Sequence, residues 1–299
     1  MSLAGLAVPV PTLFGPDGAL DPEKNARFGQ ELARTGVDHL FVLGSLGEFP
    51  LLTDDERSRL LSAVLGAPLG AADVWVGCGA PSTRQAVGYA VAAERAGASA
   101  LVVVPPYYLH PPPAGIDRYY RAIRAAVRLP LLAYNIPSLV GYALAPAQLH
   151  ALYRDRVLVG TKDTAGSIAS VAGFLRDAPE GFAVLPGDDA LAAEAIRLGA
   201  VGAIMGVANF APRVCAALVT AARSGDVARA TELQGLVSAL VEVTRAAPFP
   251  AVDKFLAARL RGAEVGYRSP YDALSAEEER AVLARLAPLE DRVRAFERT

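Results

Sequence analysis

The strongest candidate for a catalytic residue in this sequence is a lysine at the end of an apolar segment. Lys162 follows Val-Leu-Val-Gly-Thr at 157–161, a run typical of a strand that is buried on both faces. Lysine is seldom buried without a reason, because removing an ammonium group from water is costly unless it is paired or neutralised. Burial also favours the neutral amine, which is a nucleophile for carbonyl carbon. The segment therefore predicts a lysine that forms a Schiff base.

The alternative is that Lys162 merely ends the strand and forms a salt bridge with Asp163 at the surface. The use of basic residues argues against this alternative. The 29 basic residues include only three lysines, so arginine is the ordinary cation of this chain. Arginine serves in a salt bridge but cannot form an imine, whereas lysine can. We therefore interpret Lys162 as the covalent nucleophile.

A glycine-rich turn follows the second predicted strand. Its sequence is Gly-Ser-Leu-Gly at 44–47, which allows backbone N–H groups to approach a ligand closely, with the Ser45 hydroxyl beside them. Such a turn suits a carboxylate or a phosphate. It is equally typical of a plain connection between a strand and a helix, so the turn alone leaves both interpretations open.

Two tyrosines are further candidates. Tyr134 ends the strand that precedes the one bearing Lys162, so its phenol could move protons to and from a carbinolamine. The alternative is a core tyrosine with a satisfied hydroxyl. Tyr108 follows Tyr107 in a proline-rich loop that continues to Pro113, where packing at an interface is a second role compatible with the first.

The elements that must position these residues repeat along the chain. A helix that ends at a glycine, followed closely by an apolar strand, occurs around Gly36, Gly97 and Gly199. Strands are predicted near 5–10, 38–43, 73–78, 99–104, 130–135, 157–162, 182–186 and 201–205. Helices are predicted near 22–35, 54–66, 82–96, 115–127, 146–153, 167–177 and 189–198, with another from about Pro212.

Eight alternating strand and helix units over about 220 residues predict a (β/α)8 TIM barrel. A doubly wound open sheet is the alternative, but no Gly-x-Gly-x-x-Gly opens the first predicted helix. In a barrel the active site lies at the C-terminal ends of the strands, which is where Ser45, Tyr134 and Lys162 fall.

The strand pattern ends at Ser224 and Gly225. We therefore divide the chain into a catalytic barrel, 1–224, and a C-terminal helical extension, 225–299. Helices are predicted in the extension over 226–246, 250–262 and 276–296. The extension is too short to be an enzyme by itself and is expected to pack on the barrel or on a partner subunit.

Composition excludes several classes of function. A net charge of −2 provides neither a basic surface for nucleic acid nor a polybasic patch for a membrane. The three histidines lie far apart in the sequence, so a metal site is not expected. Two cysteines, an N-terminus without a basic segment, and no apolar run of about 18 residues predict a cytoplasmic protein without a signal peptide or membrane span.

Five motifs together resemble a known family, the dihydrodipicolinate synthase/N-acetylneuraminate lyase family. They occur in that family in the same order and at similar spacing, and they cover nearly the whole chain, the tail included. One such motif would be weak, but five in register are specific. They are Gly-Ser-Leu-Gly-Glu at 44–48, Pro-Tyr-Tyr at 106–108, Tyr-Asn-Ile-Pro-Ser at 134–138, Gly-Thr-Lys-Asp at 160–163 and Leu-Pro-Gly-Asp-Asp at 185–189.

The resemblance implies a pyruvate-type Schiff-base lyase that needs no metal and no organic cofactor. By position, Lys162 resembles the imine-forming lysine, Tyr134 the general acid/base and Ser45 the hydroxyl relay. Tyr108 resembles a relay tyrosine that is contributed across a dimer interface, so a homodimer or homotetramer is expected.

Two further positions are implied to bind substrate together with Ser45. Leu46 stands where the family often has threonine, and it keeps the backbone N–H for the substrate carboxylate while losing a hydroxyl. Ile204 falls where a backbone carbonyl of the family contacts the bound keto acid.

Two departures from the family pattern concern the substrate. In the family's synthases an arginine comes directly after Tyr-Asn-x-Pro-Ser and holds the carboxylate of aspartate semialdehyde. In this chain Leu139 occupies that position. In the family's N-acetylneuraminate lyases an acidic residue comes directly after the Gly-x-Asp of strand seven and binds the sugar chain. In this chain Ala190 occupies that position. Gly-Glu-Phe-Pro at 47–50 and Gly-Tyr-Arg-Ser-Pro at 266–270 instead resemble aldolases of 2-keto-3-deoxy sugar acids or 4-hydroxy-2-oxoglutarate.

We therefore expect an aldolase that makes or breaks a C–C bond between pyruvate, or another 2-oxo acid, and an aldehyde. The alternatives are 4-hydroxy-tetrahydrodipicolinate synthase proper and a dehydratase of deoxy-keto acids. From another class, the chain could be a non-catalytic keto-acid sensor. The joint presence of Ser45, Tyr108, Tyr134 and Lys162 argues against the sensor, because binding alone needs no proton relay.

Overall fold

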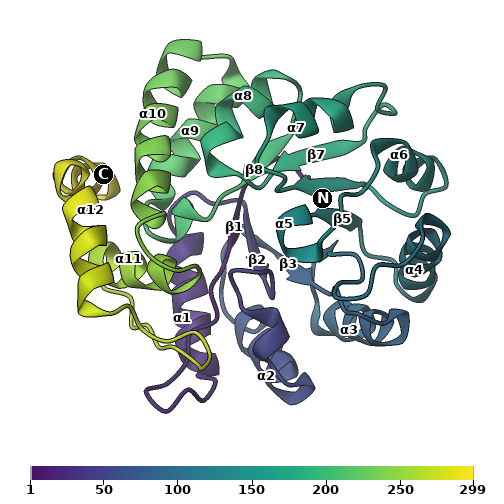
Figure 1. The fold of residues 1–299 in the computed structure, drawn as a ribbon, viewed down its shortest axis with the longest axis horizontal. Coiled ribbons are helices and arrows are strands. Elements are labelled where there is room, and N and C mark those ends of the chain that lie inside the picture. The colour runs from purple at the N-terminus through teal and green to yellow at the C-terminus, as the bar shows by residue number, and fades with distance from the viewer. Residues whose placement is uncertain (1, 299) are drawn as a thin grey trace.

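The computed structural model describes residues 2–298, in which eight parallel strands alternate with helices (Figure 1). The strands lie at the centre and the helices surround them. The strands are β1 (Gly5–Pro9), β2 (His39–Val42), β3 (Asp73–Gly77), β4 (Ala100–Val103), β5 (Leu131–Asn135), β6 (Gly160–Asp163), β7 (Ala183–Pro186) and β8 (Gly202–Ile204). The helices that accompany them are α1 (Pro22–Ala33), α2 (Asp54–Leu65), α3 (Thr83–Ala96), α4 (Pro113–Ala126), α5 (Pro137–Val140), α6 (Pro146–Arg154), α7 (Ile168–Leu175), α8 (Ala192–Arg197) and α9 (Pro212–Ser224).

The strands form one barrel, as predicted. Each strand pairs in parallel with its sequence neighbours from β1 to β7, and β8 pairs with β1. The remaining gap is closed where the Val201 N–H, just before β8, donates to the Val184 carbonyl of β7 at 3.1 Å. Closure brings the C-terminal ends of all eight strands around one opening, which is why residues far apart in sequence share a site.

Alternating side chains along the strands form two apolar layers. One set fills the barrel interior and includes Phe41, Trp75, Val102, Leu132 and Leu185. The other set packs outward against the helices and includes Leu40, Val42, Val74, Val76, Leu101, Val103, Leu131 and Val184. Both faces of each strand are therefore buried, which explains why the strands read as continuous apolar runs in the sequence.

The strand that bears Lys162 is shorter than the predicted 157–162. The N–H groups of Val157 and Leu158 both donate to the Leu152 carbonyl at the end of α6, at 2.8 and 3.4 Å. Ladder pairing starts only where the Val159 N–H donates to the Leu131 carbonyl at 2.9 Å. A buried connection and a buried strand have the same apolar composition, so the pattern could not separate them.

Short helical turns account for the other differences from the predicted elements. The predicted helix over 189–198 is divided into a 3-10 turn, η2 (Asp189–Leu191), and α8. Two more 3-10 turns, η1 (Phe49–Leu51) and η3 (Val207–Asn209), and the single-turn α5 were not predicted. All four lie just after strands, in the segments that surround the barrel opening.

The C-terminal extension contains the three predicted helices, α10 (Val227–Thr244), α11 (Ala251–Arg261) and α12 (Ala276–Glu297). It packs on the barrel: α10 lies along α9, and α12 contacts both (Figure 1). The boundary at residue 224 remains a prediction. Within residues 2–298 no helix is long and apolar enough to cross a membrane.

Candidate active site

A cavity of about 370 Å³ occupies the opening at the C-terminal ends of the strands. Five of the six predicted site residues line it, so closure of the barrel brings them together from three strands and the glycine-rich turn. Its other walls come from α5, from the segment after β7 and from the extension. The five residues are Ser45, Leu46, Tyr134, Lys162 and Ile204.

Lys162 projects into this cavity from β6. It lies opposite Tyr134 in the β5–β6 register, and its Nζ is 4.2 Å from the centroid of the Tyr134 ring and 5.0 Å from that of Phe41. The residue is 4% exposed. A β-carbon on Gly187 of the neighbouring segment would approach Lys162 Cε to 2.5 Å, so glycine is needed there for the lysine to extend.

Asp163 does not serve as the surface partner of Lys162. Its Oδ1 accepts a hydrogen bond from Asn135 Nδ2 at 2.7 Å, and both side chains are buried. The Asn135 Oδ1 in turn accepts from the Leu144 N–H at 2.9 Å. This arrangement ties the ends of β5 and β6 together and leaves the Lys162 amine to the cavity.

Tyr134 and Ser45 provide two hydroxyl groups beside the lysine. Their oxygens are 3.5 Å apart, and either can act as donor. Tyr134 is 4% exposed, with its ring edge-on to Phe41. A chain of two hydroxyls next to a buried amine can carry a proton between the lysine and solvent, and such contacts shorten when substrate binds.

The glycine-rich turn presents free donors to the same cavity. Within the described residues, the N–H groups of Ser45 and Leu46 donate no hydrogen bond to the protein. Two hydrogen bonds fix the conformation of the turn. Thr12 Oγ1 donates to the Gly47 carbonyl at 2.6 Å, and the Glu48 N–H donates to the Ser45 carbonyl at 3.0 Å. Two fixed, unpaired N–H groups are suited to bind a carboxylate.

A buried ion pair attaches this turn to the extension. The Glu48 carboxylate pairs with Lys254 Nζ of α11, and the two side chains are 2% and 1% exposed. Lys254 Nζ also donates to the Gly266 carbonyl at 3.1 Å and lies 4.7 Å from the centroid of the Phe14 ring. Glu48 has a left-handed backbone (φ 53°), so the conformation of the turn depends on this contact.

Replacing Lys254 with methionine should destabilise the protein by about 3–5 kcal/mol, because it leaves the Glu48 carboxylate buried without a partner. The Glu48→Gln/Lys254→Met double variant should lose less stability, since no charge is left unpaired. The measurement is chemical denaturation at pH 7. Arg197→Met, which removes an exposed pair with Glu194, is the control and should change stability by at most about 1 kcal/mol. A single Lys254 variant as stable as the wild type would contradict the role assigned to the pair.

Tyr108 is the one predicted site residue that the fold does not bring to the cavity. Its side chain is 89% exposed, and its backbone is left-handed (φ 73°), which is uncommon for tyrosine. Its neighbour Tyr107 instead packs edge-on against Phe49, with ring centroids 5.9 Å apart. Tyr108 therefore points away from the site of its own chain.

The cavity also contains residues that sequence reasoning did not assign. Asp189 belongs to one of the five motifs, and its oxygens accept from the N–H groups of Gly206 and Val207 at 3.1 and 2.7 Å. Arg245 and Asp253 come from the extension and carry no local signal of a site. They could be found only by knowing how the extension folds back over the barrel.

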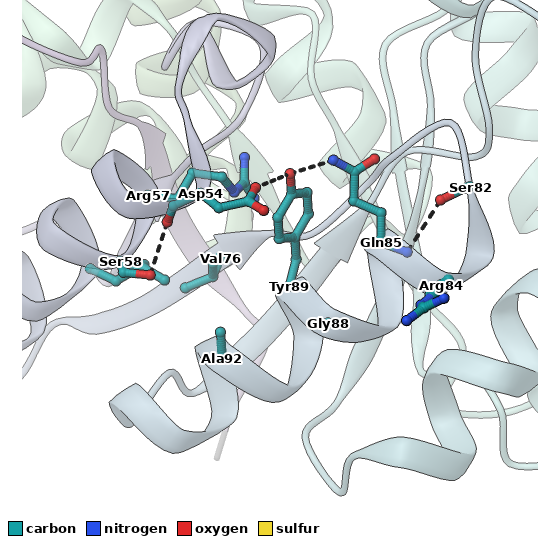
Figure 2. A pocket seen from close by; sticks show the side chains of 11 residues that line it. Asp54, Arg57, Ser58, Val76, Ser82, Arg84, Gln85, Gly88, Tyr89 and Ala92 are labelled. Atoms are coloured by element: carbon teal, nitrogen blue, oxygen red, sulfur yellow. Dashed lines mark hydrogen bonds between the residues drawn. The ribbon is translucent and has the colours of Figure 1, made fainter.

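A second hollow, of about 530 Å³, lies between α2 and α3 on the outside of the barrel (Figure 2). It contains none of the predicted catalytic residues. The Tyr89 hydroxyl donates to Asp54 and accepts from Gln85, each at 2.7 Å (Figure 2). Arg57 donates to the Gly77 carbonyl at 2.8 Å. Since these polar groups already have partners within the protein, the cavity at the strand ends is the candidate active site.

Comparison with known sequences identifies the family of the chain. Residues 2–288 match the model of the dihydrodipicolinate synthetase family. An uncharacterized DapA-like lyase of Halobacterium salinarum is 37% identical, over 97% of this chain and 95% of the relative. The "Putative 2-dehydro-3-deoxy-D-gluconate aldolase YagE" of Escherichia coli K12 is 36% identical over 76% of each chain, and a 4-hydroxy-tetrahydrodipicolinate synthase of Chlorobium chlorochromatii is 33% identical over 94% and 95%.

Solved structures show the same fold. The crystal structure of YagE in complex with pyruvate superposes with a TM-score of 0.91 at 31% identity, covering 97% of this chain and 99% of the other. The 4-hydroxy-tetrahydrodipicolinate synthase of Methylacidiphilum fumariolicum SolV superposes with a TM-score of 0.92 at 26% identity, covering 99% of both chains.

Proposed function

The chain belongs to the dihydrodipicolinate synthetase family, whose members are pyruvate-dependent lyases, and from this premise we propose that it is an aldolase acting through an imine on Lys162. The observation that supports the proposal most is the buried amine of Lys162 beside the hydroxyls of Tyr134 and Ser45. The likeness to YagE, solved with pyruvate, supports a 2-oxo acid as the first substrate.

The reaction begins when the neutral Lys162 amine attacks the keto carbon of pyruvate. Tyr134 delivers a proton to the resulting hydroxyl, which leaves as water, and the proton is replaced through Ser45. The protonated imine is an electron sink, so the relay of Tyr134 and Ser45 takes up a proton from C3 and an enamine forms. The enamine adds to the carbonyl carbon of the aldehyde, whose oxygen receives that proton back from the relay, and water then releases the product from Lys162. The steps are reversible.

The free N–H groups of Ser45 and Leu46 would hold the carboxylate of the oxo acid. Leucine in place of a hydroxyl residue leaves these backbone donors unchanged. Because the donors are fixed by the Glu48–Lys254 pair, the keto carbon is presented to Lys162 in one orientation.

The remaining wall favours a hydroxylated aldehyde over aspartate semialdehyde. Leu139 of α5 lines the cavity with a 59% exposed apolar side chain where a cation would be needed for a second carboxylate. Arg245 also lines the cavity, but its guanidinium is paired with Glu242. The hydroxyls of Ser138 and Thr164 line the cavity instead, and Thr164 Oγ1 is buried without a partner within the described residues.

We therefore propose a substrate of the 2-keto-3-deoxy sugar acid or 4-hydroxy-2-oxoglutarate type. The second candidate is 4-hydroxy-tetrahydrodipicolinate synthase activity, which is favoured by the several synthases among the relatives. A deoxy-keto acid dehydratase would use the same imine and lose water instead of an aldehyde.

Incubation of the enzyme with pyruvate and a panel of aldehydes tests this choice. The kcat/KM for aspartate semialdehyde should be at least about tenfold below that for glyceraldehyde, because one lost charge-assisted pair is worth more than a neutral hydrogen bond. Glyoxylate measures the 4-hydroxy-2-oxoglutarate alternative, and product masses separate addition from dehydration. Leu139→Arg should raise the value for the semialdehyde, whereas Leu198→Arg, a control elsewhere on the surface, should not. Efficient use of the semialdehyde by the unaltered enzyme would show that Leu139 does not decide the substrate.

We also propose a homo-oligomer, a dimer or tetramer, in which Tyr108 completes the proton relay of a neighbouring copy. The proposal is supported by the exposed, left-handed Tyr108, which does not reach its own cavity.

Co-expression of two defective variants tests the oligomer. Tyr108→Phe and Lys162→Ala should each be inactive alone, but a mixed dimer has one site with both residues intact. Random pairing should restore about a quarter of wild-type activity, since half of the dimers are mixed and one of their two sites works. A fully active monomer in sedimentation at assay concentration would contradict the proposal.

We place the enzyme in the cytoplasm. Cys78 and Cys215 are both buried free thiols, as is usual in a reducing compartment.

A further inference from the structure

A carboxyl group of the extension forms part of the active-site wall. Asp253 lies in the first turn of α11, is 6% exposed, and lines the same cavity as Lys162 and Tyr134. A buried carboxyl that faces a ligand cavity without a cationic partner is a candidate functional group, because burial of an unpaired charge is costly. The mechanism proposed above does not use this group.

Asp253 shares its surroundings with a second carboxyl, Asp189. Both approach Gly206: Asp189 Oδ1 accepts from the Gly206 N–H at 3.1 Å, and Asp253 Oδ1 lies 3.8 Å from the point where a β-carbon of Gly206 would be. Two buried carboxyls this close to one glycine cannot both ionise without a large cost, because like charges repel strongly where water is excluded.

The charged side chains around the pair do not neutralise Asp253. Lys254, the next residue of α11, pairs with Glu48, and Arg245, the residue after α10, pairs with Glu242. The turn η3, which packs on α11, has no charged residue. Glu290 of α12, which also contacts α11, pairs with Arg259. Asp188 adds another negative charge to the cavity wall. Lys162 interacts electrostatically with Asp189.

Backbone hydrogen bonds stabilise the ionised form of one carboxyl more than that of the other. Asp189 receives two backbone hydrogen bonds, from Gly206 and Val207, whereas Asp253 receives only that of its own N–H. Burial raises the pKa of Asp189 to about 6, with the two N–H groups opposing the rise. Burial and the charge of Asp189 raise the pKa of Asp253 to about 7.

We propose that the proton of this carboxyl pair resides on Asp253, and that Asp253 donates it as a hydrogen bond to an oxygen atom of the 2-oxo acid bound on Lys162. The assignment rests on the proposed function, because it takes an anionic oxo acid as the ligand. A neutral carboxyl donates to such a ligand, whereas an ionised carboxyl has no proton to donate and repels it. Asp253 is then a substrate-binding residue supplied by the extension.

The affinity for pyruvate therefore depends on pH in a defined direction. Below about pH 7 Asp253 is protonated and donates, and above it the ionised form weakens binding. Formation of the imine has a pH dependence of its own, so the contribution of Asp253 is isolated by comparison with a variant that cannot ionise. Asp253→Asn is such a variant, because its amide remains a donor of nearly the same size.

The test is reductive trapping of the pyruvate adduct with cyanoborohydride, quantified by intact mass over a range of pyruvate concentrations. The half-saturating concentration of wild type relative to D253N should rise about tenfold between pH 6 and pH 8. Asp253→Leu, which has no donor, should bind more weakly than D253N at every pH. Asp55→Asn, which removes a carboxyl that is 78% exposed on α2, is the charge-matched control and should follow the wild type.

Two results would overturn the proposal: a wild-type to D253N ratio that does not change with pH, or equal binding by the Asn and Leu variants. Neither affects the proposed function, which fails only if wild type yields no adduct on Lys162. Thermal unfolding supplies a second measurement. Because folding raises the pKa of Asp253 above its ordinary value of 3.8, stability is lost as pH rises to about 7. The melting temperature of wild type relative to D253N should therefore fall between pH 5 and about pH 7, and a constant difference would contradict a buried proton.

Discussion

Replacing Lys162 with arginine should reduce turnover by on the order of 10⁴–10⁶-fold, the range seen when a covalent nucleophile is removed. Arginine keeps a long basic side chain at the Tyr134 ring but cannot form an imine, so the loss of turnover reports the missing imine chemistry. Lys24→Arg, at a half-buried lysine outside the cavity that pairs with Asp21, is the matched control and should retain activity.

The same prediction has a direct chemical readout. Borohydride added together with pyruvate should attach a reduced three-carbon adduct to the peptide that contains Lys162, and the Lys162→Arg variant should acquire none. Peptide mass mapping distinguishes the three lysines of the chain. An adduct on Lys24 or Lys254, or no adduct on the wild type, would overturn the imine mechanism. Lys254 is the more informative of the two, because it is buried and already paired with Glu48.

Replacing Tyr134 with phenylalanine should preserve pyruvate binding and reduce turnover by about 10²–10⁴-fold, the usual worth of general acid/base catalysis. The ring that packs on Phe41 and faces Lys162 is kept, and only the hydroxyl 3.5 Å from Ser45 Oγ is removed. The loss should therefore appear in kcat, with the half-saturating concentration of pyruvate little changed.

Tyr153→Phe is the control for this experiment. Its hydroxyl donates to the Glu180 carbonyl at 2.8 Å, at a distance from the cavity, so turnover should stay at the wild-type level. Near-normal turnover of the Tyr134 variant would leave Tyr134 as a core tyrosine, which is the alternative raised by its sequence context.

Local patterns in the sequence were sufficient for the barrel and for most of its site. Each strand is buried on both faces, so it reads as an apolar run, and glycines at helix ends take left-handed backbones, as Gly97 does at φ 96°. Eight such units predict a barrel, and in a barrel the C-terminal ends of all strands surround one opening. Ser45, Tyr134 and Lys162 could therefore be grouped from the order of the predicted strands alone.

The precise start of β6 could not be predicted, because hydrogen bonds and not composition separate the link at Val157 and Leu158 from the strand. The exposure of Tyr108 could not be predicted either. Its loop is rich in proline, and the left-handed backbone that turns the side chain outward follows from the path of the loop over the barrel.

The contribution of the extension to the site was decided by tertiary structure alone. Lys254 and Asp253 are neighbours in sequence, yet one binds Glu48 behind the glycine-rich turn and the other reaches the cavity beside Asp189. Helical periodicity predicts that α11 exists, but it does not say which barrel residue each of its side chains meets. By itself the sequence determined the strands, the helices and the residue types able to form an imine, since these follow from local burial and chemistry. Which buried charges are paired, and which carboxyl keeps a proton, depends on contacts between segments far apart in the sequence, and only the folded chain defines those contacts.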